Sequence, residues 1–196
     1  TLNKKRKNMI NKNISIKYKK ITYDNKDELT PELIKEIYDH NPFLNTPNNK
    51  KTKTFEQFER EQYAKIDSKK LSYLLYVVYV NDEFAGMAEG RIQNDEFYVN
   101  HLFVKDKFQK QGLAYKLKTY LIADIRKNYK EVNEITSWSL KEMQKINEKI
   151  MGKRPLPDGT YRTQKSERVA YTISSTKLYS STKEQKIIIK RRNKPK

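Results

Sequence analysis

The chain has 196 residues and no cysteine, which excludes disulfide bridges, thiolate metal ligands and a cysteine nucleophile. Its 42 lysines and arginines outnumber its 24 aspartates and glutamates, and the formal net charge is +18. The two histidines lack the His-Glu-x-x-His spacing of a helical zinc site, so we expect no metal. No apolar run approaches the ~20 residues that span a bilayer, and we expect a cytoplasmic protein.

The positive charge is concentrated at the two ends of the chain. Residues 1–13 hold five basic residues and no acid, and residues 183–196 hold seven basic residues and one acid. We expect residues 1–13 to be a flexible basic tail, residues 14–182 to form one domain, and residues 183–196 to hold a last strand and a second basic tail. Basic tails favour anionic partners such as RNA or the ribosome, because each neutralised phosphate releases counterions.

The first third of the chain predicts a strand and two helices. Apolar residues alternate over residues 14–23, which indicates a strand. Thr30, Pro31 and Glu32 form a typical helix start, and a second helix is expected from Thr54 after the turn-rich residues 41–53.

The middle of the chain predicts an antiparallel meander followed by a crossover unit. The meander strands, separated by Asn-Asp turns, are residues 71–80, 83–92 and 97–104. Apolar residues then recur every three or four positions from Gln111 to Lys127, which indicates a helix. A strand over 132–138 and a helix over 140–150 follow. A strand, helix, strand connection predicts that strand 132–138 lies parallel to strand 97–104.

The sequence patterns that indicate secondary structure are weaker after Gly152. Residues 154–162 are rich in turn-forming residues and predict a loop. Closing strands are expected over 169–173 and 186–190, with a serine- and threonine-rich connector over 174–182.

The segment from Val104 to Ala114 has the character of a phosphate-binding turn. It joins the end of a strand to the start of a helix, where the first backbone N–H groups have no helical partner and attract an anion. Gly112 and Ala114 leave room for a pyrophosphate to approach those amides. Lys107 and Lys110 add positive charge at the rim.

The same segment resembles motif A of the GNAT superfamily, the acyl-CoA-dependent N-acyltransferases, because Phe103-Val104 is followed by Gln109-x-x-Gly112-x-Ala114. Residues 132–152 resemble the family's motif B through Met143, Ile146, Asn147 and Glu148. The chain departs from that motif where it reads Ile150-Met151-Gly152-Lys153, since the family usually closes this helix with Leu-Gly-Phe.

The resemblance implies an α+β fold, with a mixed, mostly antiparallel central sheet flanked by helices and a β-α-β-α half (core 71–152) that binds acetyl-CoA. It also implies an N-acetyltransferase in which a primary amine of a small molecule or protein attacks the thioester directly in a ternary complex. The cofactor-binding residues that it implies are Leu102, Phe103, Val104, Gln109, Lys110, Gln111, Gly112, Leu113, Ala114 and Asn147.

The catalytic candidates are less well marked by the sequence. The amine must lose a proton, so a carboxylate or histidine is needed within reach; Glu89, Glu96 and His101 lie on or beside the meander strands, and Glu89 and His101 are preferred. Asn147 stands where many relatives of this family carry the tyrosine that protonates the departing thiolate. Water, Tyr161 or Tyr171 are the alternative donors.

Two other functions are compatible with the sequence. The basic tails agree with an acetyltransferase whose substrate lies on RNA or the ribosome. The imperfect motif B also leaves room for a non-catalytic binding module with this fold.

Overall fold

The computed structural model describes residues 14–45, 50–139, 141–151, 161–164, 169–170 and 182–189. Eight strands form one sheet in the order β1-β2-β3-β4-β5-β8-β6, and β7 also pairs with β8. Of the described strand pairs, β4 and β5 are parallel and the others are antiparallel. The strands are β1 (Ile16–Ile21), β2 (Tyr73–Val80), β3 (Glu83–Gln93), β4 (Glu96–Val104), β5 (Glu134–Ser139), β6 (Tyr161–Gln164), β7 (Val169–Ala170) and β8 (Thr182–Ile189).

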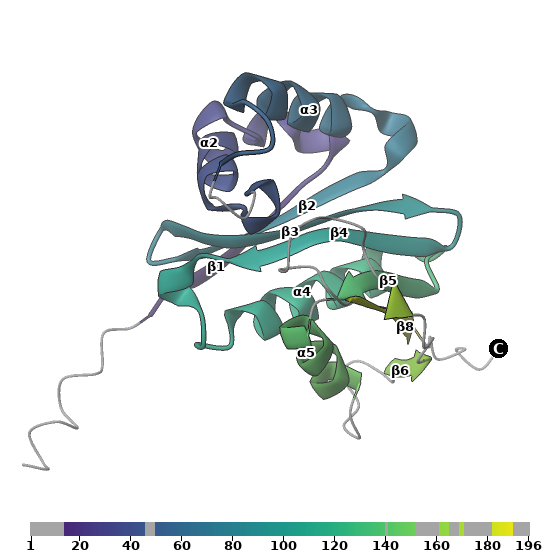
Figure 1. Cartoon of the computed structure of the whole chain (residues 1–196). Coiled ribbons are helices and arrows are strands. Elements are labelled where there is room, and N and C mark those ends of the chain that lie inside the picture. Colours follow the sequence, from purple (N-terminus) through teal and green to yellow (C-terminus); the bar gives the residue numbers. More distant parts are fainter. Residues whose placement is uncertain are drawn as a thin grey trace, which may run out of the picture.

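Helices cover both faces of the sheet (Figure 1). On one face lie α2 (Pro31–His40) and α3 (Phe55–Asp67), joined in part by the short helix η3 (Pro42–Leu44). On the other face lie α4 (Leu113–Asn128) and α5 (Lys141–Met151). Each layer buries its own apolar cluster against the sheet. This mixed, mostly antiparallel sheet between helices confirms the predicted fold class. None of the described helices is both long and apolar enough to cross a bilayer.

The helix starts follow the local sequence. The Thr30 side chain accepts a hydrogen bond from the Leu33 N–H, and Pro31 occupies the first helical position. At α3, Thr54 and Gln57 form a reciprocal capping box. Both predicted helices are therefore confirmed at the residues where they were expected to begin.

The meander is also confirmed. Asn81 and Asp82, which link β2 to β3, have positive φ angles of 51° and 64°, the left-handed conformation that Asn and Asp tolerate in two-residue hairpin turns. The predicted parallel pairing is present between β4 and β5, where Glu96 to Val99 lie opposite Glu134 to Ser137.

Two irregularities in β4 create an opening beside its second half. The register with β3 changes from Glu89 opposite His101 to Gly90 opposite Val99, so Asn100 is an extra residue in a β-bulge. The pairing with β5 ends at Val99. Among the described residues, β4 beyond Asn100 is therefore paired on its β3 side only, and a wedge opens between β4 and β5.

The last part of the chain differs from the sequence-based prediction. Residues 161–164 form β6, although residues 154–162 were predicted to be a loop. The strand expected over 186–190 begins earlier, at Thr182, and lies between β5 and β6. Of the strand expected over 169–173, Val169–Ala170 is β7, and the remainder lies outside the described residues.

Candidate active site

The turn before α4 has the geometry of an anion site. Gly112 is the N-cap of α4 with φ 77°, and no side chain caps the helix there. Lys110, two residues earlier, also has a positive φ of 59°. A Cβ added to Gly112 would meet no atom within 4 Å, so the space in front of this residue is open. The first backbone N–H groups of α4 can therefore reach a ligand.

Gln109 and Gln111 form side-chain hydrogen bonds within this turn. The Gln109 amide donates to the Val104 carbonyl at 3.1 Å and to Asp106 Oδ1 at 2.8 Å. The Gln111 amide donates to the Lys107 carbonyl at 3.1 Å. The structure thus places these two predicted cofactor-binding residues in the wall of the turn, where their side chains fix its shape.

Two lysines near the turn are held by acidic residues. Lys105, which is 8% exposed, donates to Glu36 at 3.0 Å and to Glu83 at 3.3 Å, and so ties the start of the turn to α2 and β3. Lys107, which was expected to attract the ligand from the rim, also forms an ion pair with Glu83. Lys105 was missed by the sequence analysis, because its partners lie 69 and 22 residues away.

Other predicted cofactor-binding residues use their side chains in the core. Phe103 packs edge-on against Phe84 in the cluster under α2 and α3, with ring centroids 6.3 Å apart. Val104 and Leu113 are buried in the opposite cluster. These three positions can therefore meet a ligand through their backbone. Leu102 differs from them, because its side chain lines the wedge.

The wedge between β4 and β5 holds a narrow cavity of about 70 Å³. Its walls come from both helical layers and from both strands. The residues that line it are Phe43 of η3, Val99, Asn100 and Leu102 of β4, Ser137 and Ser139 of β5, Lys118 of α4 and Met143 of α5. The cavity therefore connects the two faces of the sheet at the point where the strands separate.

Asn147 lies behind this cavity and does not line it. It is fully buried on α5, and its amide donates to Ser139 Oγ at 3.0 Å and to Ser137 Oγ at 3.4 Å. Both serines are cavity residues. The structure thus connects Asn147 to the wedge through two hydroxyls.

The structure brings Glu89 and His101 together beside the wedge. They are direct partners in the β3–β4 register, and His101 Nδ1 lies 2.5 Å from Glu89 Oε1. The Tyr73 hydroxyl donates to the other oxygen of the Glu89 carboxylate, and Lys65 Nζ lies 3.5 Å from Oε1. Phe43, a cavity residue, packs on the His101 ring at 4.9 Å between centroids.

The electrostatics of this cluster keep Glu89 ionised. Burial by itself raises the pKa of the Glu89 carboxyl, but the hydrogen bond from His101 and the charge of Lys65 outweigh that effect and lower the pKa to about 2. Burial and the neighbouring carboxylate raise the pKa of Tyr73 well above its usual value, so its hydroxyl stays protonated. An ionised Glu89 accepts the Nδ1 proton of His101 and leaves Nε2 as the basic nitrogen. The ring is 35% exposed, so Nε2 can meet a substrate.

The third predicted base lies elsewhere. Glu96 is at the opposite end of β4, where it and Glu134 form ion pairs with Lys186. Among the predicted proton donors, Tyr161 belongs to β6, but its side chain is outside the described part of the structure, as is Tyr171 altogether.

Lys118 is a cavity residue that the sequence analysis missed. It is fully buried on α4, and its Nζ has no hydrogen-bond partner among the described residues. Burial lowers its pKa to about 7. The sequence did contain a signal, because Lys118 interrupts the apolar stripe of Ala114, Leu121, Ile122 and Ile125 at helical spacing.

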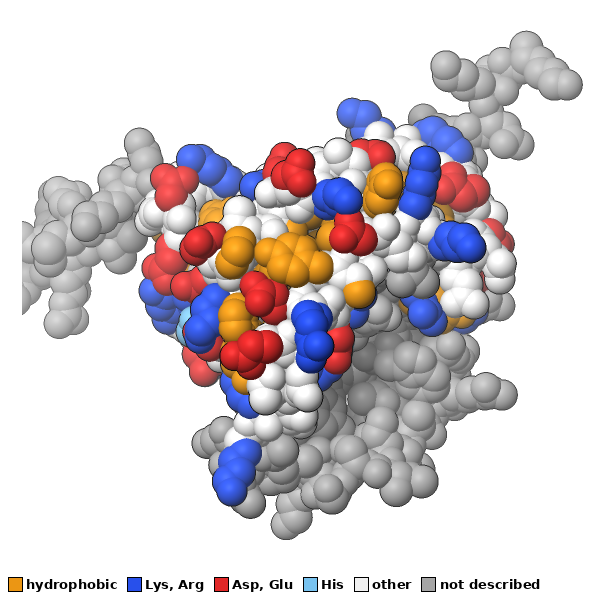
Figure 2. All heavy atoms as spheres, turned by 90° about the horizontal axis from the view of Figure 1, so that it is seen from above, with side chains coloured by type: hydrophobic (Ala, Val, Ile, Leu, Met, Phe, Trp, Pro, Cys, Tyr) orange, Lys and Arg blue, Asp and Glu red, His pale blue; other side chains and the backbone are white. Residues whose placement is uncertain are grey.

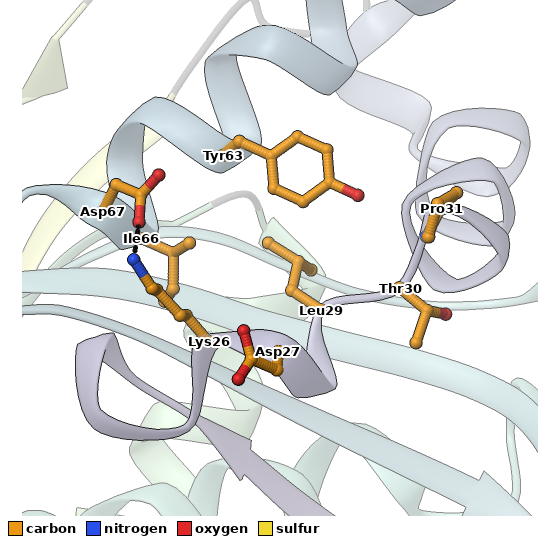
Figure 3. Close-up of a pocket in the computed structure, with 8 residues that line it drawn as sticks. All are labelled: Lys26, Asp27, Leu29, Thr30, Pro31, Tyr63, Ile66 and Asp67. Carbon is orange, nitrogen blue, oxygen red and sulfur yellow. Dashed lines mark hydrogen bonds and ion pairs between the residues drawn. The ribbon is translucent and has the colours of Figure 1, made fainter.

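A larger pocket of about 350 Å³ lies between α3 and residues 26–31, away from the wedge cavity. Figure 3 shows Lys26 and Asp67 paired across it, at 2.5 Å between Nζ and Oδ1. It shares no lining residue with the wedge cavity. From α3 it takes Tyr63, Ile66 and Asp67, whereas Gln62 and Lys65 of the same helix contact the Tyr73–Glu89 cluster. We therefore take the wedge, and not this pocket, as the candidate active site.

Comparison with known proteins identifies the class of enzyme that this wedge and turn belong to. Residues 43–150, more than half of the chain, match the family described as acetyltransferase (GNAT) domain. The chain belongs to the GNAT family and is an acetyltransferase of that class. The match includes α3, β2 to β5 and α4 in full, and most of η3 and α5.

Solved structures show the same fold at low sequence identity. Spermidine N-acetyltransferase from Vibrio cholerae, in complex with CoA and spermine, has a TM-score of 0.63 at 13% identity and covers 89% of this chain and 95% of its own. The ribosomal-protein-S18-alanine N-acetyltransferase from Escherichia coli has a TM-score of 0.56 at 16% identity, over 89% and 91% of the two chains. No curated protein sequence matches the chain significantly.

Proposed function

We propose that this protein transfers an acetyl group from acetyl-CoA to a primary amine of a small molecule or protein, by direct attack in a ternary complex. The observation that carries the proposal is the position of His101, oriented by the buried, ionised Glu89, beside the wedge where β4 and β5 separate. Membership of the acetyltransferase family indicates the class of reaction, and the position of His101 provides a base beside the wedge.

The residues of the turn and the wedge fit acetyl-CoA. The open space before Gly112 and the uncapped N-terminus of α4 suit a pyrophosphate. The edge of β4 from Asn100 to Val104, which β5 leaves free, suits the amide-bearing pantetheine arm. Acetyl-CoA supplies the activated acyl group, and this chain's residues bind and orient it.

The acceptor amine approaches from the face of the sheet that carries His101. His101 Nε2 takes the proton that the amine loses on attack, and Glu89 stabilises the imidazolium that results. Asn100, the extra residue of the bulge, lines the wedge, where a backbone N–H of β4 that is unpaired among the described strands can stabilise the developing oxyanion. Tyr73 and Lys65 hold the Glu89 carboxylate in place.

The two structural neighbours are named as N-acetyltransferases of spermidine, which carries primary amines, and of an alanine of ribosomal protein S18. A substrate on RNA or the ribosome remains our second candidate, because residues 1–13 and 183–196 are strongly basic. Residues 1–13 and 190–196 lie outside the described part of the structure.

The test is release of the CoA thiol from acetyl-CoA across a panel of amines that includes polyamines and peptides with free N-termini. We expect thiol release with at least one amine, and a loss of about 100-fold in kcat for His101→Gln with acetyl-CoA binding retained. Binding of acetyl-CoA without thiol release for any amine would instead support a non-catalytic binding module. An unchanged kcat in His101→Gln would remove this residue from the mechanism.

The phosphate-binding turn has its own test in a matched pair of variants. Gly112→Asp and Gly112→Asn place side chains of equal size in the open space, and both residues tolerate a positive φ. The aspartate repels the pyrophosphate, so we expect its acetyl-CoA affinity to fall at least about tenfold below that of the asparagine variant. Isothermal titration calorimetry measures both affinities. Equal affinities would show that no phosphate lies near this residue.

A further inference from the structure

We infer that Lys118 is a second catalytic residue of the acetyl transfer proposed above, the general acid that protonates the departing sulfur of coenzyme A. The inference rests on that proposed function and adds a proton donor that neither the family match nor the sequence motifs assign. Its basis is the position of one buried ammonium group in the wall of the wedge.

The position of the Lys118 side chain suits a proton donor to the departing sulfur. Lys118 lines the wedge cavity from α4, together with Asn100 of the bulge and the two serines of β5. Phe43 closes the cavity from the opposite helical layer and packs on His101. The cavity therefore has the proposed base near one end and the ammonium in its wall on the other face of the sheet. Acyl transfer needs this separation, because the attacking nitrogen and the leaving sulfur occupy different sides of one carbon.

Within the described part of the chain, Lys118 lacks a structural partner. Its side chain is fully buried, and no described residue accepts a hydrogen bond from Nζ. Burying an ammonium group without a partner costs folding free energy. A side chain that only fills space in the core is therefore normally apolar, and a lysine at this position needs another explanation. Lys20 and Lys105, two other lysines that the fold partly or largely buries, are each paired with carboxylates. A ligand in the wedge would supply the missing partner of Lys118.

The chemistry of the cavity residues also favours Lys118 as the proton donor. The other residues that line the cavity are uncharged, and their polar members, Asn100, Ser137 and Ser139, cannot give up a proton near neutral pH. Burial alone lowers the pKa of Lys118 to about 7. A free thiol has a pKa of about 8.5, so proton transfer from this ammonium to a thiolate is favourable. Asn147, which occupies the place of the usual tyrosine, has no acidic proton.

The proton balance of the step is complete. The amine nitrogen forms a bond to the acetyl carbon and gives one proton to His101 Nε2. The bond between carbon and sulfur breaks with its electron pair on sulfur, and Lys118 Nζ gives that sulfur a proton. His101 then releases its proton to solvent, and Lys118 takes one back. The sum is one amide and one thiol from one amine and one thioester.

The test compares Lys118→Met with Lys127→Met. Methionine preserves the length and apolar stem of the side chain but carries no proton, and Lys127 is an exposed lysine in the last turn of the same helix. We expect Lys118→Met to lower kcat about 100-fold while the KM for acetyl-CoA stays near the wild-type value. Lys127→Met should leave both constants unchanged. Lys118→Met should also melt at a higher temperature than wild type, because it removes an unpaired buried charge, whereas loss of a structural lysine would lower the melting temperature.

A second readout does not depend on turnover. The pKa of the thiol of bound coenzyme A is measured from the ultraviolet absorbance of its thiolate as the pH is raised. We expect the thiolate to form at lower pH on the wild-type protein than on Lys118→Met, because the thiolate and the Lys118 ammonium titrate as a pair in which each charged form stabilises the other. The inference would be overturned by equal thiol titrations on wild type and Lys118→Met, or by an unchanged kcat in that variant. Stable acetylation of Lys118 in mass spectra of the wild-type protein would also overturn it. If the wild-type protein binds coenzyme A but releases no thiol with any amine, the proposed function fails, and the titration still decides whether Lys118 meets the sulfur.

Discussion

At the scale of single residues, Glu89, which we propose orients the catalytic base, also contributes to the stability of the fold. Its pKa in the folded protein is about 2, below its ordinary value of 4.5, so the native state binds the carboxyl proton less readily than the unfolded state. The stability that this group contributes is fully present above pH 4.5 and is lost as the pH falls through about 2. A buried carboxylate held by His101, Tyr73 and Lys65 has this property because its partners favour the charged form.

We therefore predict that Glu89→Gln removes part of the acid sensitivity of the protein. The difference in free energy of unfolding between wild type and this variant should favour wild type at pH 6 and shrink as the pH falls from about 4.5 toward 2. Urea unfolding at a series of pH values measures it. Glu142→Gln, on the exposed side of α5, is the control and should show no such trend. A difference that does not change with pH would mean that Glu89 is not ionised in the folded state.

Residue type and strand position identified Glu89 and His101 as candidates, but their partnership depends on the β3–β4 register, which no local pattern reveals. The same holds for the ion pairs of Lys105, whose partners are distant in sequence. Lys118 is a different case. Its place on the apolar stripe of α4 was visible in the sequence, yet in a chain with 42 basic residues one more lysine draws no attention.

At the scale of secondary-structure elements, α4 is tied to the sheet by a partly buried polar cluster. Asp124 of α4 accepts two hydrogen bonds at 3.0 Å from Lys20 of β1 and one at 2.8 Å from the hydroxyl of Tyr76 of β2. Lys20 and Asp124 are 25% and 12% exposed. The first strand of the sheet is thereby tied to the helix that carries Gly112 and Lys118.

This arrangement predicts a large contrast between two Asp→Asn variants. Asp124→Asn weakens the pairing of Lys20 and the hydrogen bond of the buried Tyr76 hydroxyl, and should cost about 2 kcal/mol of stability. Asp82→Asn removes the partner of Lys17, another β1 lysine, but that pair is 61% and 76% exposed, so the cost should stay below about 1 kcal/mol. Urea unfolding measures the free energy of unfolding that each variant loses relative to wild type. Equal losses would show that burial does not determine the strength of these pairs.

The elements that were predicted well are those whose signals are local. Helix caps at Thr30 and Thr54 and the turn at Asn81-Asp82 are determined by neighbouring residues, and the structure has them where the sequence placed them. The end of the sheet was predicted less well because β8 pairs with β5, about fifty residues earlier, and with β6. Long-range pairing decides that residues 182–185 join a strand, although Lys183 and Glu184 are of residue types that strands disfavour.

At the scale of the whole molecule, the charge of the ends contrasts with that of the body. Over the face that carries α2 and α3, basic and acidic side chains are interspersed, and neither kind gathers into a single patch (Figure 2). Residues 1–13 and 190–196 each hold five basic residues and no acid, so removing both lowers the net charge by ten. If the protein has an electrostatic attraction to nucleic acid, these segments carry most of it.

Deleting the two basic end segments tests whether they bind RNA. Because β1 begins at Ile16 and β8 ends at Ile189, deletion of residues 1–13 and 190–196 leaves every described strand whole, whereas a cut at residue 183 would remove β8 from the middle of the sheet. We expect the trimmed protein to keep its affinity for acetyl-CoA and to lose RNA binding that the full chain shows at low salt. Filter binding to a mixed RNA pool over a range of salt concentrations measures the RNA affinity of both proteins. A full-length chain with shuffled tail sequences should bind as the wild type does, since contacts to phosphates do not read sequence. RNA affinity that survives the trimming would place the contact on the folded body, and with it the substrate-docking surface of the second candidate function.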